Sequence, residues 1–135
     1  MNQVDLNRYM EFVRAVTSKE SDNFDHLQAR INELRSENFN PALLFTAAIG
    51  LGSEGGEFQE IVKKIFFQGK PVNEENVFHM KRELGDLCWY LAQACMALDT
   101  NFDEILSMNY EKLSARYPEG TFDVYRSENR VVGDV

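Results

Sequence analysis

The sequence predicts an all-α protein, a helical bundle of four to five helices. Apolar residues recur at helical spacing along most of the chain, and no segment alternates with the period of two that a strand requires. Asn, Pro and Gly residues stand where these periodic segments begin or end. The chain has 135 residues, of which 44% are hydrophobic. We therefore expect a single domain over residues 1–135, with a sizeable core.

Two amphipathic helices are expected in the first 40 residues. Apolar side chains are spaced for one helix over residues 6–16 and for a second over residues 24–35. The polar stretch between them, residues 17–23, is expected to be a loop. These first 40 residues match no motif that we can assign.

Two long helices follow. Asn40 can cap the first of them, with Pro41 at its first position. Its apolar pattern continues to about residue 67, and Gly-Lys-Pro at residues 69–71 stops it. Asn73 can cap the next helix, which continues to about residue 98.

The C-terminal part predicts one shorter helix. Asn101 and Glu104 resemble a capping box at its start. It ends near residue 117, where Pro118 and Gly120 follow. The tail, residues 121–135, is polar and shows no strong periodicity.

Two acidic pairs point to a metal site. Glu54 and Glu57 stand on the first long helix, and Glu83 and Asp86 on the second. Each pair is spaced i, i+3, so its carboxylates share one side of the helix. Antiparallel packing of the two helices would gather all four, and such a cluster needs a cation. Oxygen ligands suit Mg²⁺ or Mn²⁺, and magnesium held by carboxylates usually binds phosphates as well. Solvated helix faces are the alternative.

Other metal and nucleotide sites are excluded by their motifs. A di-iron bundle needs Glu-x-x-His on two helices. His26 and His79 instead follow Asn23 and Asn76 at that spacing. The chain also has no Cys/His zinc spacing, no phosphate-binding loop ending in Lys-Ser/Thr, and no dinucleotide fingerprint.

Charge and cysteine usage restrict the partners and the compartment. The formal net charge of −8 argues against nucleic-acid and anionic-membrane binding. We expect no membrane span and no signal peptide, because there is neither a long apolar run nor a basic and apolar N-terminus. Cys88 and Cys95, seven residues apart on one helix, are separated by about 10 Å and cannot form a disulfide. We read both as reduced core residues of a cytoplasmic protein.

Four glycines crowd the first acidic pair: Gly50, Gly52, Gly55 and Gly56. Each costs a helix roughly 1 kcal/mol relative to Ala. They indicate either a kink or break near Gly50, or the close approach of another helix or a ligand.

Three sequence blocks resemble one protein family. GSEGGEFQEIVKK and KRELGDLCWYL carry Glu-x-x-Glu and Glu-x-x-Asp, and MNYEKLSARYPEG follows them. In this order they resemble the MazG-type all-α nucleoside triphosphate pyrophosphohydrolases, over about residues 43–130. The resemblance implies Mg²⁺-dependent hydrolysis of nucleoside triphosphates to monophosphate and pyrophosphate, and a homodimer or homotetramer.

The resemblance also implies residue roles. Glu54, Glu57, Glu83 and Asp86 correspond to the metal ligands and form the catalytic set. Glu57 or its neighbour Glu60 is our hypothesis for the group that takes a proton from the attacking water.

Basic and amide side chains are candidates for substrate binding. Lys64 follows Glu57 by seven residues and points in nearly the same direction on a helix, whereas Lys63 points elsewhere. Three further candidates match the third family block: Asn109, Lys112 and Arg116. Ordinary surface or capping positions are the alternative for all of these.

Several other side chains have two readings. We expect Trp89, Tyr90 and Tyr117 in the core rather than stacked on a base. His79 either hydrogen-bonds Glu83 or only lies near the start of its helix. Phe66-Phe67, at a helix end, is a candidate for a subunit interface.

The sequence thus favours an Mg²⁺-dependent nucleotide pyrophosphohydrolase that removes or regulates nucleoside triphosphates. A catalytically silent nucleotide-sensing or acidic protein-binding module is the first alternative. A plain helical assembly protein is the second, and it would show no stabilisation by Mg²⁺.

Overall fold

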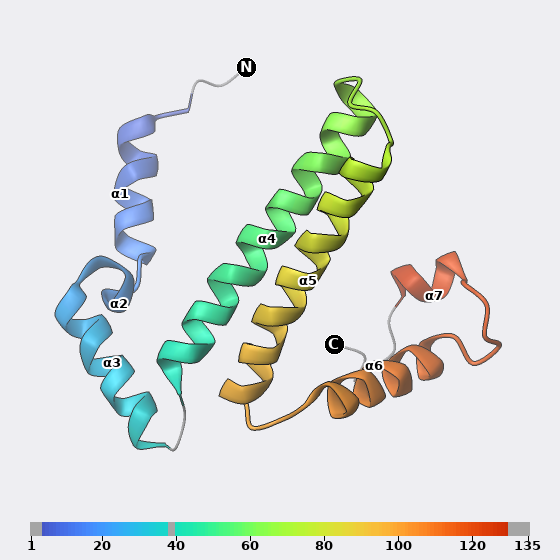
Figure 1. The fold of residues 1–135 in the computed structure, drawn as a ribbon. Helices are drawn as coiled ribbons and strands as arrows, with labels where there is room; N and C mark the ends of the chain where they lie inside the picture. Colours follow the sequence, from blue (N-terminus) through green and yellow to red (C-terminus); the bar gives the residue numbers. More distant parts are fainter. Residues whose placement is uncertain (1–3, 38–39, 130–135) are drawn as a thin grey trace. The chain divides into compact units, whose positions relative to one another are not determined.

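The computed structural model describes residues 4–37 and 40–129. Seven helices and no strand occur in these residues, which confirms the all-α fold class (Figure 1). The chain divides into two compact units, Met1–Pro41 and Ala42–Val135. The single domain over 1–135 stays a prediction. None of the described helices combines the length and apolarity that a membrane span requires.

The first unit consists of α1 (Leu6–Val16), α2 (Lys19–Asp22) and α3 (Phe24–Ser36). α1 and α3 coincide with the two predicted N-terminal helices. The single turn α2 lies in the stretch predicted as a loop. Ser18 caps it, because its hydroxyl oxygen accepts from the backbone N–H of Ser21 at 3.2 Å. A helix of one polar turn has no apolar periodicity, so residue spacing could not reveal it.

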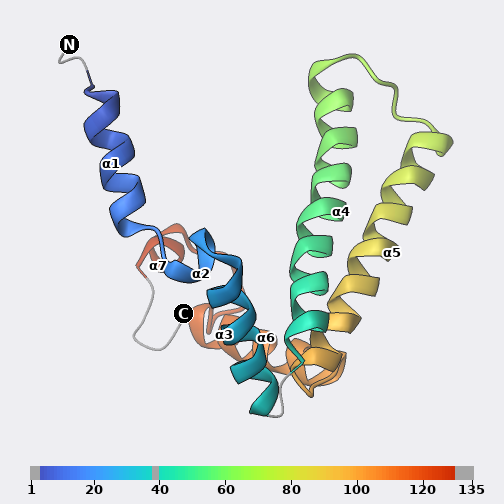
Figure 2. The same ribbon diagram turned by 90° about the vertical axis from the view of Figure 1, so that its left-hand side faces the viewer.

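The two long helices form an antiparallel hairpin in the second unit. α4 (Pro41–Phe67) and α5 (Glu74–Ala97) run side by side in opposite directions in both views (Figures 1 and 2). Their observed limits agree with the prediction to within a residue or two. The loop that joins them is short, and it fixes which turns of the two helices face each other.

Residues of this loop are held by specific local bonds. Gly69 has a φ of 72°, a left-handed conformation that favours glycine, and it ends α4. The N–H of Lys70 then donates to the carbonyl of Lys64 at 3.1 Å. Asn73 caps α5 by accepting from the N–H of Asn76 at 2.9 Å, and the buried Asn76 amide donates to the carbonyl of Pro71 at 2.7 Å. These bonds make the turn a defined connection.

The glycines of α4 admit a second helix. α4 is one continuous helix through Gly50, so the predicted break is absent. A Cβ built on Gly50 would overlap the ring of Tyr90 on α5, and one on Gly55 would touch Leu87 at 4.0 Å. Close approach of another helix is therefore the correct reading for Gly50. A Cβ on Gly52 or Gly56 would meet no atom within 4 Å.

Two further helices complete the second unit. α6 (Phe102–Arg116) is capped as predicted, because Asn101 accepts from the N–H of Glu104 at 3.0 Å. The carboxylate of Glu104 accepts a hydrogen bond from the hydroxyl of Thr100 and not from the N–H of Asn101, so the second bond of the predicted capping box is absent here. α7 (Val124–Glu128) is a short helix within the tail, which the sequence left without an element. The last tail residues, 130–135, lie outside the described part of the chain.

The single chain buries little apolar surface. Among the described residues, the buried apolar side chains are Ala47, Cys95 and Ala97. Trp89 is 65% exposed and Cys88 is exposed as well, so both core predictions are wrong for the isolated chain. Tyr90 is partly buried against Gly50. The prediction of a sizeable core is therefore not met by one chain alone.

Candidate metal centre

Three of the predicted carboxylates form a cluster between α4 and α5. One oxygen each from Glu54, Glu57 and Glu83 lies within 4.8 Å of the others. We call these three residues the carboxylate cluster. Glu57 is exposed, and Glu54 and Glu83 are partly buried. Such a separation suits oxygen ligands around one small cation.

The register of the hairpin produces this cluster. Gly50 of α4 faces Tyr90 of α5, and residue numbers fall on α5 as they rise on α4. Moving one to two turns along the pair from this contact brings Glu54 and Glu57 level with the acidic residues of α5. The acidic pairs therefore meet because the Gly50–Tyr90 contact and the short loop fix how the helices pair.

Asp86, the fourth predicted carboxylate, is exposed and lies outside the group of three. It still acts on the cluster, because its negative charge helps to raise the pKa of Glu54. One turn of α5 separates it from Glu83. The structure thus brings three predicted ligands together and leaves the fourth beside them.

The surroundings of Glu54 disfavour its ionised form. Desolvation of the partly buried side chain is the largest cause of a raised pKa at Glu54. The charges of Glu57, Asp86 and Glu83 raise the pKa further, in that order. Because like charges at this range destabilise the ionised form, a divalent cation would relieve the repulsion.

Lys64 follows Glu57 by two turns on α4, and it already has a partner. Its Nζ lies 2.9 Å from Oε1 of Glu60, an i, i+4 ion pair on α4. The hydrogen bond from Lys64, followed by the charges of Lys64 and Lys63, lowers the pKa of Glu60. Glu followed by Lys four residues later on a helix is a recognisable pairing signal, so this ion pair could have been predicted from the sequence.

The candidates of the third block lie on one side of α6. Asn109, Lys112 and Arg116 are spaced i, i+3, i+7. Asn109 and Lys112 are exposed, and Arg116 is partly buried. Neither Asn109 nor Lys112 makes a side-chain hydrogen bond or ion pair within the part of the chain that the structure describes.

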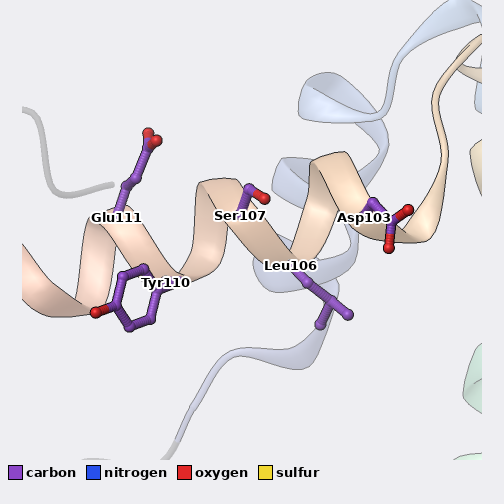
Figure 3. Close-up of a pocket in the computed structure, with 5 residues that line it drawn as sticks. All are labelled: Asp103, Leu106, Ser107, Tyr110 and Glu111. Carbon is purple, nitrogen blue, oxygen red and sulfur yellow. The ribbon is translucent and has the colours of Figure 1, made fainter.

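A shallow depression occupies the opposite side of α6 (Figure 3). Its lining side chains belong to successive turns of this helix: Asp103, Leu106, Ser107, Tyr110 and Glu111. At about 100° of rotation per residue, this stripe and the one that carries Lys112 face away from each other. The depression is therefore separate from the predicted phosphate contacts.

The structure also places the side chains for which the sequence left two readings. Nε2 of His79 lies 3.9 Å from Oε1 of Glu75, so its carboxylate neighbour is Glu75 and not Glu83. The ring of Tyr117 packs against Phe122, with centroids 5.8 Å apart. Phe66 and Phe67 are 75% and 84% exposed at the end of α4.

Comparison with known families agrees with this geometry. Residues 46–121 match the model of the MazG nucleotide pyrophosphohydrolase domain. The chain belongs to this family. The match includes both acidic pairs and the block on α6, so the MazG resemblance predicted from the three sequence blocks is confirmed.

A curated phage protein is similar to part of this chain. The chain is 37% identical over 73 residues to the Gene 37 protein of Mycobacterium phage L5. That alignment covers 53% of this chain and 64% of the phage protein, so the chain spans less than two thirds of this relative. No solved structure was found to match the chain.

Proposed function

We propose that this protein hydrolyses nucleoside triphosphates, ribo- or deoxyribo-, to nucleoside monophosphate and pyrophosphate in an Mg²⁺-dependent reaction. One observation supports it above all. In a MazG-family chain, three carboxylates from two antiparallel helices lie within 4.8 Å of one another. Its role would be house-cleaning or control of the nucleotide pool, in the cytoplasm, where both free cysteines stay reduced.

The donor set fits a hard divalent cation. Glu54, Glu57 and Glu83 would hold Mg²⁺, with Mn²⁺ as a substitute, and Asp86 would complete the ligand set from one turn away. Bound there, the metal would neutralise charge on the triphosphate and on the leaving pyrophosphate.

The chain's own side chains would bind the phosphates and move the proton. Lys64 on α4, with Asn109, Lys112 and Arg116 on α6, supplies donors for phosphate oxygens. Glu57 is a better proton acceptor for the attacking water than Glu60. The reason is that the ion pair with Lys64 lowers the pKa of Glu60 and weakens it as a base.

We also propose that the functional form is a homodimer or homotetramer. Large apolar side chains on the hairpin are exposed in one chain, among them Phe45, Ile49, Trp89 and Met96. A monomer rarely leaves this much apolar surface in water, and closed homo-oligomers are the usual remedy. Sedimentation equilibrium should give a mass of two or four chains, and a monomer at micromolar concentration would refute the proposal.

A product assay tests the reaction directly. Purified protein, Mg²⁺ and a panel of ribo- and deoxyribonucleoside triphosphates are incubated, and the products are separated by ion-exchange chromatography. Monophosphate plus pyrophosphate is the expected result, and its rate across the panel ranks the bases and sugars. Diphosphate plus orthophosphate would overturn the mechanism. Nucleotide binding without product, with Mg²⁺ or Mn²⁺, would favour the silent binding module.

A further inference from the structure

The ion pair of Glu60 and Lys64 lies one turn beyond the carboxylate cluster on α4. Glu57, Glu60 and Lys64 are spaced i, i+3, i+7, so their side chains share one side of the helix. Long side chains on a helix lean toward its N-terminus. Lys64 therefore leans toward the cluster, and Glu60 is the first carboxylate that its ammonium meets, with Nζ to Oε1 at 2.9 Å.

An unrestrained lysine at this position would be poorly suited to bind phosphate. Its side chain has many rotamers, and ordering them costs conformational entropy. Glu60 removes this cost, because its carboxylate holds the ammonium about one turn from Glu57.

Stability alone gives little reason for this pair. Its side chains are 44% and 54% exposed, and exposed i, i+4 pairs contribute little to stability. The ammonium has three N–H donors, so it can keep the bond to Glu60 and still donate to a phosphate oxygen. The ion pair can therefore hold the Lys64 ammonium in place while leaving it free to bind a phosphate oxygen.

We propose that Glu60 is a positioning residue that holds the Lys64 ammonium beside the carboxylate cluster, where it receives a phosphate group of the nucleotide. This inference rests on the proposed pyrophosphohydrolase function. It adds a residue that acts through Lys64 and does not itself touch substrate or metal.

The test compares Glu60→Gln with Glu75→Gln. Both variants remove one negative charge from an i, i+4 pair, and Glu75 pairs with His79 at 3.9 Å on α5. We expect Glu60→Gln to raise KM about 3–10-fold with kcat within about twofold, because the ammonium is no longer held. Glu75→Gln should leave both unchanged. The melting temperature should barely change in either variant.

The sign of the change in KM separates positioning from general electrostatics. Removing a negative charge near the site should by itself attract the triphosphate and lower KM. A lower or unchanged KM in Glu60→Gln, or an equal rise in Glu75→Gln, would overturn the proposal. In a Lys64→Gln background, Glu60→Gln should have no further effect, and an additive effect would equally refute coupling.

Binding of inorganic pyrophosphate with Mg²⁺, measured by calorimetry, separates this inference from the proposed function. If the wild type hydrolyses nucleotides and Glu60→Gln binds pyrophosphate normally, only the positioning role fails. If the wild type binds pyrophosphate but yields no product, the function fails, and weaker binding by Glu60→Gln still supports positioning. A wild type that neither binds pyrophosphate nor yields product would refute both.

Discussion

The α4–α5 hairpin and α6 both carry residues predicted for the site, but they differ in whether those side chains lie near other polar groups of the chain. The hairpin brings Glu54, Glu57 and Glu83 within 4.8 Å of one another. On α6, Asn109 and Lys112 are exposed and have no side-chain partner among the described residues. A short loop and one glycine contact fix the hairpin. Asn109 and Lys112 have no such restraint from the described residues.

The charges of the two regions are complementary. Neighbouring carboxylates help to raise the pKa of Glu54, so negative charge accumulates at the hairpin. On α6, the positively charged Lys112 has no ion pair within the described residues. A divalent cation bound to a triphosphate supplies the opposite charge to each region, so this pattern of charge supports the proposed substrate. Variants in either the hairpin or α6 test this complementarity.

The largest effect is expected at the cluster. Glu57→Gln keeps the shape of the side chain but removes the charge of a metal ligand. Losing a residue that only orients a ligand costs up to about 100-fold, so turnover should fall by more than that. Stabilisation of the protein by Mg²⁺ should also be lost. Product assays and thermal melts with and without Mg²⁺ measure the two effects.

Asp86→Asn tests whether the fourth carboxylate belongs to the catalytic set. We expect it to abolish turnover as well, with the helical circular dichroism unchanged. Glu111→Gln is the matched control, because Glu111 lines the depression on the far side of α6. An active Glu57→Gln, Asp86→Asn double variant would contradict the assignment.

The next effect concerns the packing that sets the register of the hairpin. Gly50→Ala places a methyl group against the ring of Tyr90 and should destabilise the protein by about 1–3 kcal/mol. Gly52→Ala meets no atom within 4 Å and should stabilise α4 by up to about 1 kcal/mol. Urea unfolding should give a lower free energy of unfolding for Gly50→Ala than for the wild type, and a higher one for Gly52→Ala. Equal stability would mean that Gly50 does not set the helix–helix distance.

The features that the sequence predicted are those with a local physical signal. α4 and α5 follow from their apolar periodicity, Pro41, Gly69 and Asn73. Glu54, Glu57 and Glu83 lie together because the acidic residues are spaced i, i+3 on two helices that pack antiparallel, as considered from the sequence. The roles of Asn109 and Lys112 stay a prediction, because neither side chain bonds to another described residue.

Predictions about the core failed for a different reason. The core prediction for Trp89 rests on its being a large aromatic residue on a helix, and that for Cys88 on the apolar spacing that it shares with its neighbours. Apolar spacing shows which side of a helix avoids water. It does not show whether that side is covered by the same chain or by another copy. α2 and α7 were missed because short polar helices depend on caps such as Ser18 and Asp123.

A moderate effect is expected on α6. If Lys112 donates to a phosphate oxygen, Lys112→Ala should raise KM about tenfold, the value of one charge-assisted hydrogen bond. Lys81→Ala removes an exposed lysine from the side of α5 opposite Tyr90 and should have no effect. A KM unchanged by Lys112→Ala would show that Lys112 does not contact the phosphates.

The smallest effect is the pH dependence of the metal-free protein. Because desolvation and neighbouring charges raise the pKa of Glu54 in the native state, the native state holds this proton more tightly than the unfolded chain. Stability should therefore fall as the pH rises above the ordinary value of 4.5 and through the raised value. Glu54→Gln lacks this titration, so without metal it should be more stable than the wild type at pH 7. The difference should vanish at pH 3, below both values.

Adding Mg²⁺ at pH 7 should make the wild type more stable than Glu54→Gln, since only the wild type keeps all three cluster ligands. A metal-free Glu54→Gln variant less stable than the wild type at pH 7 would show that Glu54 has a stabilising partner and that the cluster does not carry the proposed repulsion.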